Sequence, residues 1–409
     1  MLNIIWVSFF LIAFVAAVCE WLIVGNVEVF ATLVQSLFDM GRLSVEIAMG
    51  LIGVLCLWLG LFRIAEKAGL IQILAKLLAP LFHRLMPEIP RGHPALGSVT
   101  MNLSANLLGL DNAATPLGLK AMQDLQKLNP NKDTASNAQI LFLVLNTSSV
   151  TLLPVTIFMY RAQQGATDPT EVFLPILFAT SASTLVGLLA VCWVQRIKWW
   201  DPVVLGYFAV FSLMITALML SLSGLDAESL RVQSTLYGNL ILISIVVWFI
   251  AYACWQKVDV YDAFIEGAKE GFEVGVKLIP YLVAMLVAIG VFRSSGAMDY
   301  LLRGIAWSVN LAGLDTRFVD ALPTAMMKPL SGSGARAMML ETMNTHGVDS
   351  FAARVSAVMQ GSTETTFYVL AVYFGSVGIK NMRHAVACGL LADAAGLTAA
   401  VLLGYWFFT

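Results

Sequence analysis

The chain has 409 residues, of which 59% are hydrophobic and only 12% are charged, with a net charge of −2. A soluble domain carries about 25% charged residues, so this chain has too few to cover a water-facing surface. The charge balance and the absence of a basic stripe also exclude a nucleic-acid partner.

Apolar runs near the ~20-residue length of a membrane-crossing helix recur along the whole chain. They predict an all-α polytopic membrane protein whose main partner is the lipid bilayer. The first run, in residues 1–24, lacks a basic start and a good cleavage site, so we expect an uncleaved first helix. The nine runs are 3–24, 44–61, 137–160, 172–195, 203–222, 236–255, 275–292, 355–377 and 384–408.

Short segments recur in the same order in the two halves of the chain, which is the mark of an internal repeat. The interval from Lys120 to Thr147 equals that from Arg336 to Thr363. The pairs are "LGLFR" (59–63) with "IGVFR" (289–293), "LKAM" (119–122) with "ARAM" (335–338), and "TSS" (147–149) with "TET" (363–365).

The repeat predicts two halves, 1–200 and 258–409, joined by a pair of membrane helices within 201–257. Each half has the same plan: an amphipathic stretch, a membrane helix ending in Phe-Arg, an amphipathic helix, a polar segment and two further membrane helices. These elements are expected at 26–42, 44–63, 64–85, 95–122, 137–160 and 172–195, and at 258–273, 275–293, 297–312, 318–343, 355–377 and 384–408.

Basic residues give the expected orientation, because cytoplasmic loops are enriched in Lys and Arg. Arg196, Lys198 and Lys257 predict a cytoplasmic face, and the acidic loop 223–235 an external one. The N-terminus is then cytoplasmic, the C-terminus external, and the halves are inverted. Against this, five basic residues would face outward, some of which we expect inside the fold: Arg293, Arg303, Arg317, Lys328 and Arg336.

Two polar segments interrupt the apolar pattern at matching positions. "GLDNAATP" (109–116) and "KPLSGSGARAM" (328–338) contain the Gly, Asn and Pro residues that break helices. We expect re-entrant or broken helices whose half-helices point tip to tip and expose backbone groups to a solute; a surface loop is the alternative. The side chains expected to bind are Asn106, Asp111, Asn112, Thr115, Ser331, Ser333 and Arg336.

A second pair of polar clusters opens later in each half, in "NTSSVT" (146–151) and "GSTETTFYV" (361–369). Glu364 is an ionisable group at membrane depth, so it should bind a cation, carry a proton, or pair with Arg336 or Lys328. Asp393 is a second candidate for ion coupling. The remaining expected solute contacts are Asn146, Thr147, Ser148, Ser362, Thr363 and Thr365.

Enzymatic chemistry finds no support in the sequence. The five Cys are scattered singly through apolar runs and the four His are dispersed, which predicts neither a metal site nor a cofactor. No P-loop or nucleophile elbow is present, so no catalytic residue is assigned. Gly267, Gly271 and Gly275, spaced four apart, predict a close helix-packing face and make a homo-oligomer plausible.

The same residues resemble a known family. "LGLDNAATPLGLKAM" and "LWLGLFRIAEKAGL" are similar to the spore maturation A family, and "PLSGSGARAMM" and "GSTETTFYVLAVYFGSVGIK" to the spore maturation B family. The chain thus resembles a fused A–B form with two nucleoside-recognition gate domains, about 44–160 and 275–377. The resemblance implies a bacterial inner-membrane protein with an architecture like concentrative nucleoside transporters.

Together these patterns predict a secondary transporter or exporter with a midplane site between two inverted repeats. Its partners would be a small solute and a coupling proton or cation. The alternative is a non-transporting membrane scaffold or receptor that acts through partners in envelope or spore-maturation processes. Neither the solute nor the direction of transport is indicated by the sequence.

Overall fold

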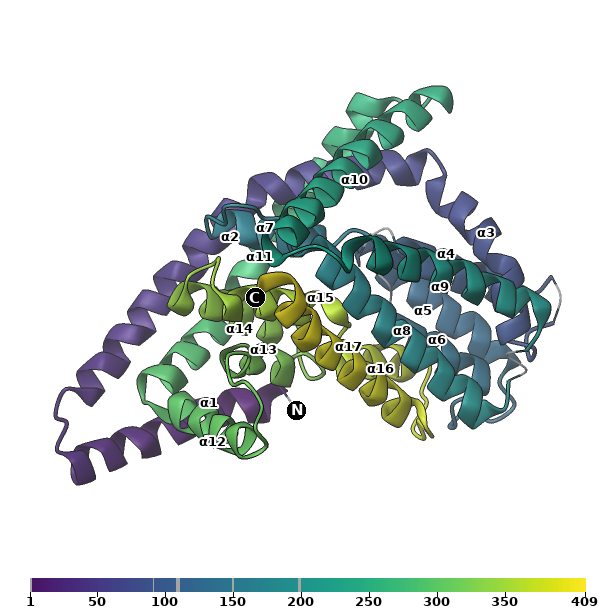
Figure 1. Cartoon of the computed structure of the whole chain (residues 1–409). Helices are drawn as coiled ribbons and strands as arrows, with labels where there is room; N and C mark the ends of the chain where they lie inside the picture. Colours follow the sequence, from purple (N-terminus) through teal and green to yellow (C-terminus); the bar gives the residue numbers. More distant parts are fainter. Residues whose placement is uncertain (1, 91, 108–110, 149–150, 198–199) are drawn as a thin grey trace.

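The computed structural model describes residues 2–90, 92–107, 111–148, 151–197 and 200–409, and for residues 2–5 and 111–113 only the backbone. Apart from one bridge between Thr134 and Asn381, the regular structure of this part of the chain is helical (Figure 1). The elements are α1 (Leu2–Cys19), the π-helix η1 (Glu20–Val24), α2 (Val29–Lys67), α3 (Leu70–Leu85), α4 (Pro94–Leu107), α5 (Asp111–Leu128), α6 (Asn137–Thr147), α7 (Val155–Gln163), α8 (Phe173–Gln195), α9 (Pro202–Leu222), α10 (Ala227–Trp255), α11 (Val260–Ser294), α12 (Ala297–Leu311), the 3-10 helix η2 (Val319–Ala321), α13 (Leu322–Met327), α14 (Gly332–His346), α15 (Phe351–Ser362), α16 (Thr366–Ser376) and α17 (Ala385–Phe408).

Seven of the described helical segments are long and apolar enough to cross a membrane, which confirms an all-α polytopic membrane protein. The expected membrane helices 137–160 and 355–377 are wrong as continuous helices. Each is two shorter helices separated by a break, α6 and α7 in the first case and α15 and α16 in the second. Both breaks fall at the polar clusters 146–151 and 361–369, which are short enough for the surrounding run to remain apolar as a whole.

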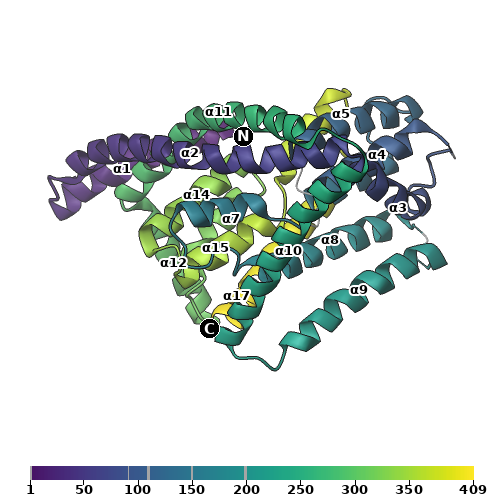
Figure 2. The ribbon, with the colours of Figure 1, turned by 90° about the horizontal axis from the view of Figure 1, so that it is seen from above.

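Two helices of unusual length, α2 and α11, lie side by side and antiparallel (Figure 2). At ~1.5 Å per residue, the 39 residues of α2 and the 35 of α11 exceed the ~30 Å hydrocarbon core. Each therefore continues the expected amphipathic stretch into the expected membrane helix without a break. A Cβ atom on Gly271 would lie 2.7 Å from Cys56 Cα, which confirms the predicted close-packing face.

Two helical hairpins occupy the predicted polar segments, and their re-entrant position in the membrane stays a prediction. In the first, α4 and α5 are antiparallel: Asn102 donates to the Ala114 carbonyl at 2.7 Å, and Ser98 to the Asp124 carboxylate at 2.8 Å. The second hairpin is formed by α13 and α14. The expectation of tip-to-tip half-helices inside these segments is wrong, because α4 and α5 pack along each other.

The two broken helices run in opposite directions. Beside the start of α6, the Ala135 backbone N–H donates to the Asn381 carbonyl at 3.0 Å, just past the end of α16. At the other end of the pair, Arg161 in the last turn of α7 contacts Asp349, just before α15. The open end of the first hairpin lies toward Asn381, since Gln126 of α5 donates to the Val377 carbonyl at 3.3 Å, and α14 of the second hairpin ends at His346, close in sequence to Asp349.

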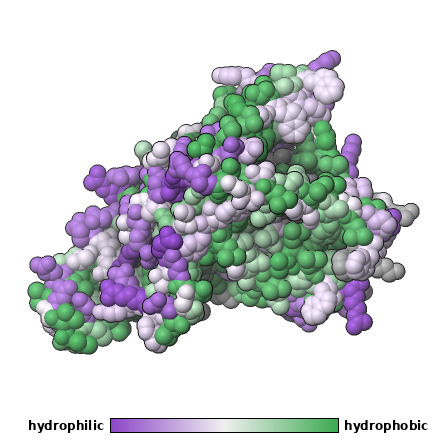
Figure 3. Space-filling view, viewed as in Figure 1, coloured by the Kyte–Doolittle hydropathy of each residue, from purple (hydrophilic) through white to green (hydrophobic). Residues whose placement is uncertain are grey.

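Helices α8 and α17 follow the two broken helices and pack on each other. A Cβ atom on Gly187 would lie 3.0 Å from that of Ala392, so small residues allow this approach. Outside them, α9 and α10 lie at the periphery with mostly exposed apolar side chains. A broad hydrophobic surface covers the region of α8 and α9 (Figure 3), as expected for a face in contact with lipid.

Candidate functional site

The first hairpin contacts the first broken helix through two asparagines. Asn106, in the last turn of α4, donates through Nδ2 to Oδ1 of Asn146 at 2.7 Å, in the last turn of α6. Near the same point the Leu152 backbone N–H donates to the Leu107 carbonyl at 3.4 Å. The end of the hairpin therefore lies against the α6–α7 break.

The two breaks contact each other directly. The backbone N–H of Glu364, in the three-residue break between α15 and α16, donates to the carbonyl of Thr147, the last residue of α6, at 2.8 Å. The last carbonyls of a helix have no partner within it. The second half of the chain thus supplies a donor for the end of a helix in the first half.

The second hairpin contacts the second break. The Phe367 backbone N–H, in the first turn of α16, donates to the Pro329 carbonyl at 2.9 Å. A Cβ atom on Gly332, at the start of α14, would lie 2.8 Å from Thr365 Oγ1, so glycine is required for this approach. The two breaks therefore contact each other, and each break also contacts one hairpin. We call this set of contacts the junction.

Several of the predicted hydroxyl ligands are already hydrogen bonded within their own elements. Thr147 and Ser148 both donate to the Val144 carbonyl, at 2.9 and 2.8 Å, and Ser362 donates to Met359 at 2.9 Å. Ser331 caps α14 by accepting from the Gly334 backbone N–H at 3.1 Å, and its hydroxyl lies 3.2 Å from that of Ser333. These groups satisfy backbone atoms near the breaks.

The exposure of the remaining predicted residues differs sharply. Glu364 and Thr115 are exposed and Arg336 is half-buried, where it donates to the Gly332 carbonyl at 3.2 Å. The side chains of Asp111 and Asn112 lie outside the described part of the structure. Among the described residues, no salt bridge involves Glu364.

Two of the basic residues that conflicted with the predicted orientation lie inside the fold. Lys328 is 3% exposed at the tip of the second hairpin. Arg293, in the last turn of α11, forms a salt bridge with Glu341 of α14, which is itself buried. Arg317 is exposed and pairs with Asp315 at 2.8 Å. Lys328 and Arg293 are therefore not free charges of an external loop.

Asp393, the second predicted ion-coupling residue, is 2% exposed in α17. It lies behind the second break, where the hydroxyls of Thr363 and Thr366 and the charges of Lys328 and Glu364 act on it. Glu364 also lies near the hydroxyl of Tyr373, which contacts the first hairpin at Gly118. The junction thus has one exposed carboxylate on one side and one buried carboxyl on the other.

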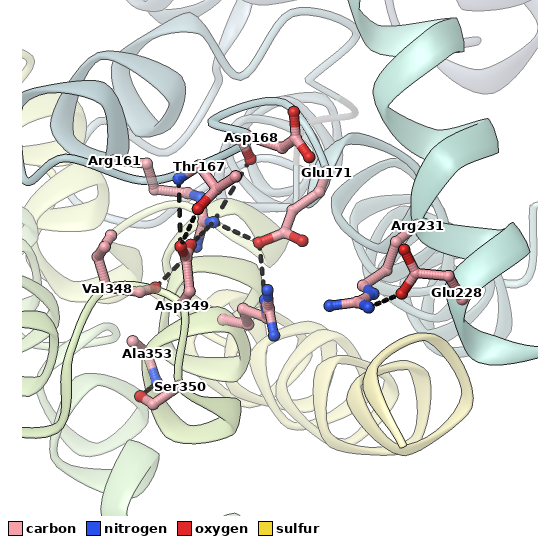
Figure 4. A network of polar contacts seen from close by, with 11 residues as sticks. Arg161, Thr167, Asp168, Glu171, Glu228, Arg231, Val348, Asp349, Ser350 and Ala353 are labelled. Atoms are coloured by element: carbon pink, nitrogen blue, oxygen red, sulfur yellow. Dashed lines mark hydrogen bonds and ion pairs between the residues drawn. The ribbon is translucent and has the colours of Figure 1, made fainter.

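A buried ionic network that the sequence reading missed joins the halves at the Asp349 end (Figure 4). Arg161 is fully buried and contacts the carboxylates of Glu171 at 2.5 Å and Asp349 at 3.3 Å. Arg354, in the first turn of α15, reaches the same Glu171 oxygen at 2.7 Å. The sequence feature that could have indicated this network is a charged residue, Arg161, directly after an apolar run.

The junction brings amide side chains and one exposed carboxylate together beside the two breaks. Among the residues that the structure describes, no group of three or more His, Cys, Asp or Glu could hold a metal ion. The side chains at the junction can form hydrogen bonds and ion pairs with a polar solute.

Comparison with known proteins gives two kinds of match. The model of the Gate family, described as nucleoside recognition, matches residues 48–163 and 275–380, which together exceed half of the chain. Spore maturation protein B of Bacillus subtilis (strain 168) is 45% identical over 159 residues, 39% of this chain and 88% of that protein. Spore maturation protein A of the same organism is 40% identical over 189 residues, 46% of this chain and 93% of that protein.

Proposed function

The chain belongs to the Gate, or nucleoside recognition, family, and from this premise we propose that it is a secondary transporter or exporter of a small polar solute. The observation that carries the proposal is the junction at which the Glu364 N–H meets the Thr147 carbonyl. Broken helices with hairpins at their breaks are a recurring plan for solute sites near the membrane midplane. The proposal assigns no catalytic residue and no cofactor.

The opposite directions of the two broken helices support an inverted repeat. Both segments matched by the family model follow one order: the end of a long helix, a short amphipathic helix, a hairpin and a broken helix. Because α6–α7 and α15–α16 are antiparallel, the same order is presented to opposite sides of the membrane. This is what alternating access requires, since each half can then close one side.

The α2–α11 pair supports the same symmetry. Gly60 and Gly290 occupy equivalent places in the repeated "GLFR" and "GVFR" segments. A Cβ atom on Gly60 would meet the Phe264 ring at 2.6 Å, and one on Gly290 would meet Ser36 Oγ at 3.0 Å, near the far end of the antiparallel pair. Equivalent residues thus make equivalent contacts about an axis between the helices.

We propose the bacterial inner membrane as the location, with the Asn381 end of the junction cytoplasmic. Lys132, Lys380 and Arg383 gather at this end, beside the contact of Ala135 with Asn381, in line with the enrichment of basic residues on the cytoplasmic side. The N-terminus is then cytoplasmic and the C-terminus external. A homo-oligomer stays a prediction, because Gly267, Gly271 and Gly275 face α2 of the same chain.

The solute class follows from the groups at the junction. The junction contains an amide at Asn106, an exposed carboxylate at Glu364 and a half-buried guanidinium at Arg336. These side chains include hydrogen-bond donors and acceptors as well as one negative and one positive charge. A polar molecule with several hydrogen-bonding groups fits this set, and the family description makes nucleosides the first class to examine.

The test is uptake of radiolabelled uridine and adenosine into proteoliposomes containing the full chain. We expect Glu364→Gln and Asn106→Ala to lower uptake at least about tenfold, which corresponds to ~1.4 kcal/mol. Glu46→Gln, which removes an exposed carboxylate paired with Arg42, is the control. Unchanged uptake by folded Glu364 and Asn106 variants would show that the site is elsewhere; no uptake by the wild type would exclude these nucleosides.

A further inference from the structure

Asp393 is the most isolated buried carboxyl in the described part of the chain. Its residue is 2% exposed, and no donor among the described residues meets full hydrogen-bond geometry at Oδ1 or Oδ2; the hydroxyls of Thr363 and Thr366 come nearest to doing so. The residue lies inside α17, a helix long enough to cross the membrane, at the level of the α15–α16 break. An acceptor-only group without well-formed hydrogen bonds is unusual in such surroundings.

The side chains around Asp393 are closely packed, and the neighbouring hydroxyl groups do not form full hydrogen bonds with it. A Cβ atom on Gly396 would lie 2.7 Å from Thr363 Cγ2, and one on Gly389 would lie 2.8 Å from Thr366 Cγ2. Ser183, which faces the same part of α17 from α8, donates to the Ala392 carbonyl at 2.9 Å. The hydroxyls of Thr363 and Thr366 form no full hydrogen bond among the described residues.

The charges that act on Asp393 are of opposite sign. Lys328 approaches from the tip of the second hairpin and Glu364 from the break. The salt bridges between described residues do not include Asp393. From α6 and α8, the groups that face this stretch of α17 are the uncharged hydroxyls of Thr147, Ser148 and Ser183.

An ionised carboxylate is costly in this position. Burying an unpaired charge in a protein interior costs several kcal/mol, whereas a neutral acid avoids most of that cost. Protonation also converts an acceptor-only group into a donor. The hydroxyl oxygens of Thr363 and Thr366 lie beside it as acceptors.

We propose that Asp393 is a proton-binding site: its carboxyl is protonated in this conformation and ionises when the α15–α16 break moves. In that step the O–H bond of the acid breaks and a new O–H bond forms to a water molecule at the opened break, which gives a carboxylate and a hydronium ion. A small shift of the break lets the hydroxyls of Thr363 and Thr366 donate to the carboxylate. The link from this proton to solute movement rests on the proposed transport function; the protonation itself does not.

The test is infrared spectroscopy of the purified full chain in sodium-free buffer at pH 7, which detects the carbonyl stretch of a protonated acid. We expect the wild type to show this band, Asp393→Asn to lose it, and Glu364→Gln to keep it. Asparagine resembles the neutral acid in shape and charge, so the Asn variant should fold. Dicyclohexylcarbodiimide, which modifies protonated carboxyls, should label Asp393 in the wild type, as read by peptide mass.

Two results would overturn the proposal. Identical carbonyl regions for the wild type and Asp393→Asn, with no carbodiimide label at Asp393, would show an ionised carboxylate. A band that disappears when sodium is added at constant pH would show that the site takes a cation instead. Neither readout depends on transport, so failed solute uptake leaves this test intact.

Discussion

The backbone N–H of Glu364 donates a 2.8 Å hydrogen bond to the carbonyl of Thr147, and this contact joins the broken helices of the two halves. It lies between two further contacts, Asn106 with Asn146 and Pro329 with Phe367. Four segments that are far apart in the sequence thus meet end to end.

The first prediction concerns the contact between Asn106 and Asn146. Each residue is replaced by Ala, singly and together, and the free energy of unfolding is measured in detergent micelles. A direct hydrogen bond should give a coupling energy of about 0.5–1.5 kcal/mol between the two sites. Additive effects would show that the contact contributes nothing; Asn310→Ala, at an exposed position on α12, is the control.

The second prediction concerns the α2–α11 interface. Gly271→Ala places a methyl group 2.7 Å from backbone atoms of Cys56, so one helix must move away. We expect a loss of about 1–3 kcal/mol in the free energy of unfolding, in the range of overpacked cores. Gly53→Ala in α2, where a methyl group meets nothing within 4 Å, should leave stability equal or higher. Equal effects of the two changes would contradict the interface.

The third prediction concerns Arg161. Removing the guanidinium by Arg161→Ala leaves the buried Glu171 with Arg354 as its remaining salt-bridge partner among the described residues. Breaking such a pair typically costs about 3–5 kcal/mol. Arg161→Lys keeps the charge but loses the planar fork, so its loss should be intermediate. Thermal unfolding measures both, and a loss no greater than that of exposed Arg303→Ala would contradict the network's role.

The fourth prediction concerns acid sensitivity at Asp349. Burial raises the pKa of this carboxyl, but hydrogen bonds from the hydroxyl and backbone N–H of Thr167, with the charges of Arg161 and Arg354, outweigh it and hold the pKa below its ordinary value. A depressed pKa adds stability above the unfolded value of about 3.9, which is lost as pH falls through the folded pKa.

The expected result is a smaller acid-induced fall in melting temperature for Asp349→Asn than for the wild type, seen below pH 4. The variant should already be less stable at pH 7, since it lacks the charge that pairs with Arg161. Parallel curves for the two proteins from pH 7 to pH 3 would show that Asp349 is not the group responsible.

The class of fold and the polar segments could be predicted from the sequence. The reason is that hydrophobic composition and helix-breaking residues affect the chain where they occur, without depending on tertiary contacts. Gly, Asn and Pro in "GLDNAATP" mark an interruption whatever surrounds it. The spacing of Gly267, Gly271 and Gly275 likewise predicted a packing face, although not that its partner is α2. The inverted relation of the halves and the domain boundaries stay predictions.

The partners at the junction could not be predicted, because they depend on tertiary contacts. Hydropathy treats 137–160 as continuous, and the helix ends at Thr147 where Glu364 supplies its donor from the other half. Ser331 was expected to bind solute, but its hydroxyl caps α14. Arg161 was missed because its partners Glu171 and Asp349 come from two different loops.

The central claim is that the junction is reachable alternately from both sides of the membrane, and cysteine accessibility tests it without knowledge of the solute. Thr115→Cys and Ser333→Cys are each placed in a chain whose five native Cys are replaced by Ser. Oriented vesicles are treated with a membrane-impermeant maleimide from one side at a time. Asp226→Cys and Lys257→Cys, in exposed positions beyond opposite ends of α10, report the orientation.

The account predicts that each orientation reporter is labelled from one side only, whereas the cysteines at 115 and 333 are labelled from both sides. Labelling of both junction cysteines from a single side, or from neither, in a folded protein would contradict alternating access. That outcome would favour the membrane scaffold or receptor.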